Sequence, residues 1–405
     1  MAFVPAFAAH DQVDMLFVIL NSIDAPIQQE LQVRFPELVK ALDDAAAAGH
    51  PASYHIGVVT TDLGSGAFSQ ACAGPPTGGK LIAGPSPQNS FPAPTDCATF
   101  KLTDGAAFID YDQVAGTSNV GGINSGHAGD DVAGAFVCTS SVGDQGCPVQ
   151  QALESAYETL HDGAPENAAF LRDDALLVVV FLADKDECSL PADSDLFDPS
   201  ADGVAKYGAL SSFRCAQFGT SCTTPPMPLD VSVAAGPLDD CTPLDQADGG
   251  KLIDVGKYID YFTRPGGVKP DPSDVILAAF IPPPAPVGWE ITTPCTGDPQ
   301  AASCPVPTHS CIAANNPAFF GNPTVRLSAV VDAALTSQRT SICDTNFSPG
   351  MASLAQSIIA RLKWPRATPD TTLSGGWQMR VANVQGRTKL LDPCASVVVK
   401  RSSRT

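Results

Sequence analysis

The stretch Val13-Asp-Met-Leu-Phe-Val-Ile-Leu20 and the residues that follow it decide the fold of this 405-residue chain. The run is short and almost continuously apolar, which is typical of a strand buried on both faces of a parallel sheet. From residue 26 to residue 48 apolar residues recur at spacings of three and four, and the pattern stops at Gly49, which predicts an amphipathic helix. Residues 54–61 form a second apolar run. The order strand, helix, strand indicates a parallel βαβ unit.

The same alternation continues along the chain. Further buried strands are predicted at residues 175–183 and 274–281, and three prolines end the second of them. Amphipathic stripes predict helices at residues 149–160, 252–262, 325–335 and 351–362. The sequence therefore predicts a doubly wound α/β fold, with a mostly parallel sheet that helices cover on both faces.

Two long stretches interrupt this alternation. Residues 64–137 lose periodicity and are rich in Gly, Pro, Ser and Asn, so we expect a stapled loop insertion without helices of its own. Residues 184–250 form a second, cysteine-rich insertion. We expect one domain over residues 11–363, followed by an appendage over residues 364–405 that is basic, Thr-rich and strand-like.

The 13 cysteines include no Cys-x-x-Cys pair, and many lie in Pro- and Thr-rich loops. This spacing favours disulfides over zinc thiolates. We expect Cys72 to pair with Cys97 and Cys215 with Cys222, because each pair lies within one loop and need not cross the core. Thirteen is an odd number, and Cys394 is the expected unpaired thiol.

Disulfides form in an oxidising compartment, so an extracellular or cell-envelope location is expected. The N-terminal sequence Met1-Ala-Phe-Val-Pro5 has neither the basic start nor the long apolar run of an export signal. We therefore expect a signal upstream of this numbering, or a trimmed start.

Composition excludes other classes of protein. Acidic residues outnumber basic ones 43 to 23, and the net charge of −20 argues against a nucleic-acid partner. The apolar runs are far shorter than the roughly 20 residues of a membrane-spanning helix, so no transmembrane segment is expected. Neither a His-Glu-x-x-His nor a Gly-x-Ser-x-Gly motif occurs, and the six histidines are scattered, so we expect a protein that is not an enzyme.

Polar, acidic segments follow the predicted strands or precede a helix. They are Leu20-Asn-Ser-Ile-Asp24, Gly143-Asp-Gln-Gly-Cys147 and Asp184-Lys-Asp-Glu-Cys188. In open α/β sheets ligands bind beyond the carboxyl ends of the strands, so these segments are the candidate site.

The chain resembles a von Willebrand factor type A domain. The segments that carry the resemblance are Val13-Asp-Met-Leu-Phe-Val-Ile-Leu-Asn-Ser22, Gln28-Gln-Glu-Leu31, Gly57-Val-Val-Thr-Thr-Asp62 and Phe181-Leu-Ala-Asp-Lys-Asp-Glu-Cys-Ser189. A later signature is similar to exported, cysteine-rich bacterial members such as those of myxobacteria: Val325-Arg-Leu-Ser328, Ser341-Ile-Cys343 and Asn346-Phe-Ser348. The resemblance covers about residues 11–363.

The resemblance implies a metal-ion-dependent adhesion site. In this family an Asp-x-Ser-x-Ser loop, a Thr and a second Asp hold Mg²⁺, Mn²⁺ or Ca²⁺, and a partner's carboxylate can complete the shell. Here Leu20 replaces the leading Asp, Ser22 matches the first Ser, and Asp24 stands at the second Ser. The family's Thr falls on Asp144, and Asp184 matches the second Asp.

Two interpretations remain open for this loop. In the first, Asp24, Asp144 and Asp184 lie close together at one edge of the sheet and, with Ser22, form an altered oxygen site for a divalent cation. In the second, Leu20 has abolished the site and the acids are solvated loop residues. The expected function is an exported adhesion or scaffold module that binds another protein through the sheet-end face. A secreted hydrolase with an acidic cleft and a purely structural envelope protein are the alternatives.

Overall fold

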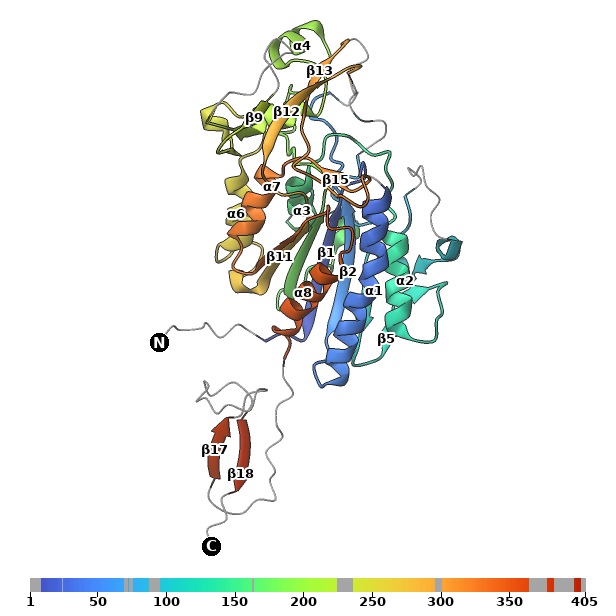
Figure 1. The fold of residues 1–405 in the computed structure, drawn as a ribbon. Coiled ribbons are helices and arrows are strands. Elements are labelled where there is room, and N and C mark those ends of the chain that lie inside the picture. Colours follow the sequence, from blue (N-terminus) through green and yellow to red (C-terminus); the bar gives the residue numbers. More distant parts are fainter. Residues whose placement is uncertain are drawn as a thin grey trace.

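The computed structural model describes residues 9–23, 25–68, 72, 76–86, 95–161, 164–223, 236–295 and 301–363, together with two strands in residues 377–381 and 397–401. Its centre is a seven-stranded sheet with the order β16-β11-β7-β1-β2-β4-β5 (Figure 1). The five strands from β16 to β2 run parallel, and β4 and β5 pair antiparallel at one edge. The strands are β1 (Gln12–Ile19), β2 (Ser53–Thr60), β4 (Ile109–Asp112), β5 (Thr117–Ser118), β7 (Leu176–Leu182), β11 (Val275–Phe280) and β16 (Ser337–Thr340).

Burial explains the apolar runs of the sequence. Every residue of β7 and β11 is buried, and in β1 and β2 only the first residue is not. A strand with helices on both faces has no side that tolerates polar residues, so its sequence is apolar throughout rather than alternating. The four predicted strands are confirmed to within one residue at each end, and the fold is a mixed α/β fold with a mostly parallel central sheet.

Helices cover both faces of the sheet (Figure 1). On one face α1 contacts α2 and α8, and on the other α6 contacts α3 and α7. The ring of Phe17 in β1 packs edge-on against Phe35 of α1 and Phe136 of α2, with centroids 5.6 and 4.6 Å away. These helices are α1 (Ala25–Ala47), α2 (Ala128–Thr139), α3 (Ala152–Leu160), α6 (Val255–Thr263), α7 (Val325–Ala333) and α8 (Ser348–Ile359).

Helix α2 corrects one expectation. Residues 64–137 were expected to hold no helix, yet α2 begins at residue 128. Gly129 and Gly134 lie within it and lower its intrinsic helix propensity. The helix forms because tertiary packing of Val132 and Phe136 in the core outweighs that propensity.

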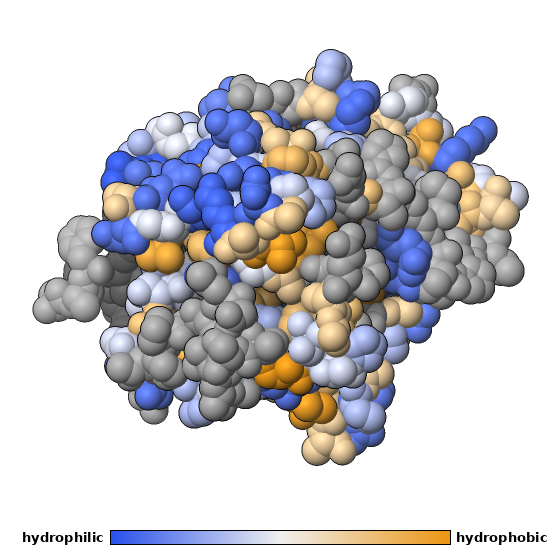
Figure 2. Space-filling view, turned by 90° about the horizontal axis from the view of Figure 1, so that it is seen from above, coloured by the Kyte–Doolittle hydropathy of each residue, from blue (hydrophilic) through white to orange (hydrophobic). Residues whose placement is uncertain are grey.

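A smaller layer lies over the carboxyl end of the central sheet, at the top of Figure 1. It consists of two short helices and two small antiparallel sheets, with the strand orders β13-β12-β9 and β10-β8. We call this layer the crown; its elements are α4 (Ala201–Tyr207), α5 (Phe213–Gly219), β8 (Thr220–Ser221), β9 (Gly236–Leu238), β10 (Thr242–Pro243), β12 (Val287–Thr292) and β13 (Cys304–Pro307). In the view from above, hydrophobic residues gather near the middle of this face, beside a band of hydrophilic ones (Figure 2).

Three further strand pairs are antiparallel and stand apart from these sheets. They are β3 (Lys101–Leu102) with β6 (Val120–Gly121), β14 (Cys311–Ile312) with β15 (Phe320–Gly321), and β17 (Trp377–Val381) with β18 (Val397–Arg401). The last pair lies in the C-terminal appendage. No helix in the described part of the chain is both long enough and apolar enough to cross a membrane.

Six disulfides connect twelve of the thirteen cysteines. They are Cys72–Cys147, Cys97–Cys138, Cys188–Cys215, Cys222–Cys241, Cys295–Cys304 and Cys311–Cys343. The remaining cysteine, Cys394, lies outside the described residues. Six disulfides indicate an oxidising compartment.

The expected pairings Cys72–Cys97 and Cys215–Cys222 are wrong, although all four cysteines do form disulfides. Each of the four bonds instead to a cysteine elsewhere: Cys97, for example, bonds to Cys138 near the end of α2. Cys72 and Cys97 each bond to a cysteine beyond their own loop, whereas Cys215 and Cys222 each bond to another cysteine within residues 184–250.

Candidate functional site

The site lies where the sheet changes its direction of winding. From β1 the chain runs to α1 on one face and to β2, whereas the strands on the other side of β1 are β7, β11 and β16. The carboxyl ends of β1 and β7 are therefore adjacent. The connection after β1 leads toward β2, and the connection after β7 leads the other way, toward β11. In open α/β sheets such a switch point is where a crevice for ligands forms.

Four polar side chains meet at this point: Ser22 after β1, Thr61 after β2, Gln150 just before α3 and Lys185 after β7. The hydroxyl oxygen of Ser22 accepts hydrogen bonds from the Gln150 amide and from the Lys185 ammonium, the latter at 3.3 Å. The Thr61 hydroxyl donates to the Gln150 amide oxygen. We call these four residues the switch-point cluster.

Gln150 is the residue that joins the loops. Its amide nitrogen also donates to the carbonyl of Cys147 at 2.6 Å, and its backbone carbonyl accepts from the Cys188 N–H at 2.5 Å. The side chain is 1% exposed, so both ends of its amide group have protein partners. The loops after β1, β2 and β7 are thereby held against the start of α3.

The predicted site residues are only partly brought together. Ser22 and Asp184 both lie beside Lys185, whose ammonium is 3.3 Å from the Ser22 hydroxyl and 3.9 Å from the Asp184 carboxylate. Asp144 lies half-buried in the loop before α3, and in this loop the Gly146 N–H donates to the Asn21 carbonyl at 2.6 Å. Asp24 lies outside the described residues.

The described residues at this point do not fit a divalent cation. Leu20 is 1% exposed and belongs to the hydrophobic core, so no carboxylate stands at the leading position. The Ser22 hydroxyl already receives two N–H donors, one of them from an ammonium. A cation bound to this oxygen would lie within a few ångströms of the positive charge of Lys185, which repels it.

A second group of potential ligands has another explanation. Asp62, Cys72 and Cys147 place one ligand atom each within 4.8 Å of one another. The two sulfurs are bonded to each other in a disulfide, so neither is a thiolate, the form that binds metals. The Asp62 carboxylate accepts backbone hydrogen bonds from Gly64 and Cys147, and burial raises its pKa.

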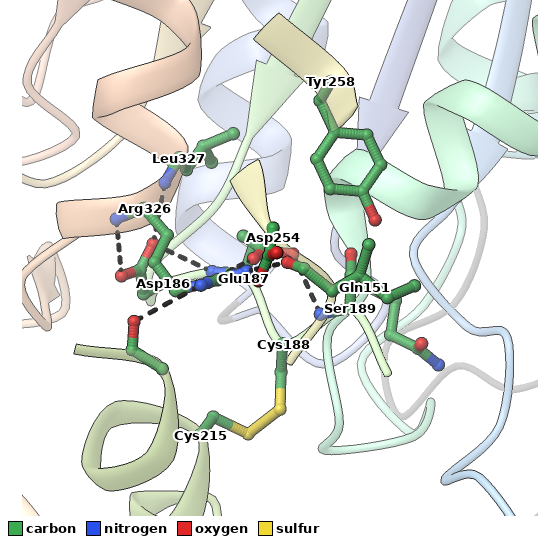
Figure 3. A network of polar contacts seen from close by, with 12 residues as sticks. Gln151, Asp186, Glu187, Cys188, Ser189, Cys215, Asp254, Tyr258, Arg326 and Leu327 are labelled. Atoms are coloured by element: carbon green, nitrogen blue, oxygen red, sulfur yellow. Dashed lines mark hydrogen bonds and ion pairs between the residues drawn. A yellow bond between two sulfur atoms is a disulfide. The ribbon is translucent and has the colours of Figure 1, made fainter. Parts of the chain in front are cut away.

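The acids that follow Lys185 have structural partners (Figure 3). The two carboxylate oxygens of Asp186 accept the backbone N–H groups of Arg326 and Leu327, at 2.9 and 3.0 Å. Asp186 therefore caps the N-terminus of α7, where the free N–H groups and the helix dipole favour a negative charge. Burial nevertheless raises the pKa of Asp186 to about 6.

Glu187 forms a buried ion pair with Arg326, whose Nε donates to a carboxylate oxygen at 2.5 Å. The other guanidinium nitrogens donate to the carbonyls of Ile253 at 2.6 Å and Gly219 at 3.3 Å. Burial is the largest single influence and would lower the pKa of Arg326, but the charges of Glu187 and Asp186 and the hydrogen bond to Glu187 together raise the pKa. The pair joins the end of β7 to α7, to the residues before α6 and to the crown.

A pocket opens beside the switch-point cluster, between the central sheet and the crown. Gln150, Lys185, Asp186 and Asn322 line its polar end. The rest of its wall is largely apolar and comes from α5, the strands β12 and β13 and the start of α7: Phe213, Ala216, Val287, Pro307, Pro323 and Val325. A lysine thus lines a mostly apolar pocket, and a few polar groups in an apolar wall are the usual composition of a ligand site.

The sequence segments singled out above lie at this candidate site, but Lys185 and Gln150 were not among the predicted site residues. Both stand inside or beside quoted segments, yet the motif of the family directs attention to acids and hydroxyls. The available signal was the basic residue between two acids in Asp184-Lys-Asp186. A comparison of this chain with protein-family models, curated proteins and solved structures gives no match.

Proposed function

We propose that this protein is an exported binding module with a fold of the von Willebrand factor A type, which contacts another protein through the carboxyl end of its central sheet. The observation that carries the proposal is the pocket at the switch point, with Lys185 at its polar end and the crown as its apolar wall. The strand order and the antiparallel edge strand support the fold type. The six disulfides support an extracellular or cell-envelope location.

Binding is favoured over hydrolysis by the state of the acid in the pocket. A hydrolase of the acidic type needs two carboxylates with free oxygens that face the substrate. Asp186 lines the pocket and has a raised pKa, but both of its oxygens accept N–H groups of α7. Among the described residues that line this pocket, Asp186 is the only acid.

Site-specific photo-crosslinking tests the proposal. Ser212 lies on the pocket rim, is exposed, and makes no side-chain cap hydrogen bond to α5, so a photoreactive residue there leaves the fold intact. Val114, which is 76% exposed in the turn between β4 and β5, is the matched control position. In the medium or envelope of the producing cells, position 212 should form one main adduct that excess unmodified protein suppresses. Equal adducts from positions 212 and 114, or none from position 212, would refute the binding function of this face.

A further inference from the structure

The ammonium of Lys185 has more hydrogen-bond donors than partners. A lysine ammonium carries three N–H donors. In the described part of the chain the Ser22 hydroxyl, at 3.3 Å, is its one acceptor at hydrogen-bond distance, because the Asp184 carboxylate is 3.9 Å away. The Lys185 side chain is 23% exposed, so most of it is covered by protein. Lys185 lines the pocket, so a ligand there can supply an acceptor for its remaining donors.

The pocket walls define the second half of a ligand. Phe213 and Ala216 of α5 and Val287 of β12 face the pocket from the crown, and Pro323 and Val325 face it from the segment that leads into α7. An apolar group that fills this space releases water from both surfaces. A molecule that offers an oxygen acceptor to Lys185 and an apolar group to these walls therefore matches both ends of the pocket.

The charges around Lys185 select the kind of acceptor. A carboxylate binds an ammonium more strongly than a neutral carbonyl does, because the opposite charges attract each other in addition to the hydrogen bond. Asp184 and Asp186 also lie near this end, but Asp184 is beyond hydrogen-bond distance and Asp186 has both oxygens bonded to α7. These two carboxylates repel a dianion such as phosphate more strongly than they repel a single carboxylate.

We infer that the pocket recognises a single carboxylate joined to an apolar group, such as the C-terminus of a chain that ends in an apolar residue, through a direct bond to the Lys185 ammonium and without a metal ion. This inference rests on the proposed function, because it names the chemistry of the same pocket.

An NMR titration of the full chain with N-acetyl-L-leucine tests the inference, since this probe joins one carboxylate to one apolar side chain. Saturable shifts are expected in the amides of residues 184–188 and 320–325. N-acetyl-L-leucine amide, which has the same shape without the charge, and inorganic phosphate should each bind about tenfold more weakly or not at all. Addition of EDTA or of Mg²⁺, Mn²⁺ or Ca²⁺ should leave the affinity unchanged.

Two variants assign the effect to Lys185. Lys185→Met keeps an unbranched apolar stem but loses the charge, and should weaken binding of N-acetyl-L-leucine about tenfold or more. Lys185→Arg keeps the charge and should retain most of the binding affinity. Lys206→Met removes the same charge from α4, where the ammonium is exposed and pairs with Asp195, and should bind like wild type. If Lys185→Met does not fold, the difference in affinity of the wild-type protein for N-acetyl-L-leucine and for its amide still tests whether the pocket recognises the carboxylate.

Equal binding of the acid and the amide, unchanged binding by folded Lys185→Met, or a requirement for a divalent cation would each overturn the inference. Its failure is distinguishable from failure of the proposed function. A specific crosslinked partner at position 212 without carboxylate binding leaves the binding module standing and removes the carboxylate. Carboxylate binding without any crosslinked partner supports recognition of the carboxylate and removes the proposed protein-binding function.

Discussion

Four consecutive charged residues, from Asp184 to Glu187, perform four different tasks. Asp184 lies beside Lys185, Lys185 faces the pocket, Asp186 caps α7, and Glu187 pairs with Arg326 in the interior. In the sequence these residues are one polar segment after a strand. Their roles differ in the structure because each successive side chain contacts a different neighbour.

Asp186 makes the stability of the fold depend on pH. Its folded pKa of about 6 lies above the ordinary value of 3.8, so the folded state holds the proton more tightly. The stability that this group contributes is fully present below about pH 4 and is lost as the pH rises through 6. Asp186→Asn cannot ionise, so relative to this variant the wild type should lose about 2 kcal/mol of unfolding free energy between about pH 4 and about pH 7.

Urea unfolding of both proteins across this pH range measures the difference. Glu187 and Arg326 act on the charge of Asp186 in opposite directions, and both are present in wild type and variant. The variant also loses one acceptor for α7, which lowers its stability at every pH without changing the slope. Parallel curves for the two proteins would contradict the raised pKa.

The candidate site was predictable only in part. That Ser22 and Asp184 lie near each other follows from parallel strands, whose carboxyl ends meet at one edge. The role of Lys185 does not follow, because an ammonium on a flexible stem reaches its partners only in three dimensions. The burial of Leu20 could not be predicted from the sequence either, since a single apolar residue after a strand can face the core or the solvent.

At the scale of elements, α7 is held by a charge pair inside the protein. The side chains of Arg326 and Glu187 are 1% and 0% exposed. Removing one partner leaves the other charged and buried, so Arg326→Met should cost about 3–5 kcal/mol of unfolding free energy. Replacing both, with Arg326→Met and Glu187→Leu, should recover most of this loss, because no unpaired charge remains.

The measurement is a double-mutant cycle by chemical unfolding. Arg339→Met is the matched control, because Arg339 pairs with Asp332 at 2.7 Å on the partly exposed surface, where a pair contributes at most about 1 kcal/mol. Strictly additive losses from Arg326→Met and Glu187→Leu would show that the pair is not coupled.

The strands and the long helices could be predicted because their apolar periodicity reflects which faces they bury. Helix α2 could not, since its glycines weaken the pattern and its stability comes from packing against α1 and β1. Disulfide connectivity could not be predicted either, because it depends on which loops the fold brings together.

For the whole molecule, the disulfides close loops of very different lengths. Cys97–Cys138 spans 41 residues of sequence and Cys295–Cys304 spans 9, and all four cysteines are buried. Closing a longer loop removes more entropy from the unfolded chain. Replacing Cys97 and Cys138 by Ala should therefore cost about 1 kcal/mol more than replacing Cys295 and Cys304. Thermal and urea unfolding of the two double variants measure this, and an equal or reversed order would speak against the chain-entropy explanation here.

The two ends of the domain are joined at the end of the sheet opposite the pocket (Figure 1). The His10 N–H donates to the Arg361 carbonyl and the Lys363 N–H to the His10 carbonyl, both at 2.8 Å, and Lys363 forms an ion pair with Asp11 at 2.6 Å. A mechanical pull applied through both ends is carried first by these few bonds and then by β1. The crown and the pocket lie at the other end of the sheet, so as long as the bonds between residue 10 and residues 361–363 hold, tension between the two ends of the chain does not load the binding face.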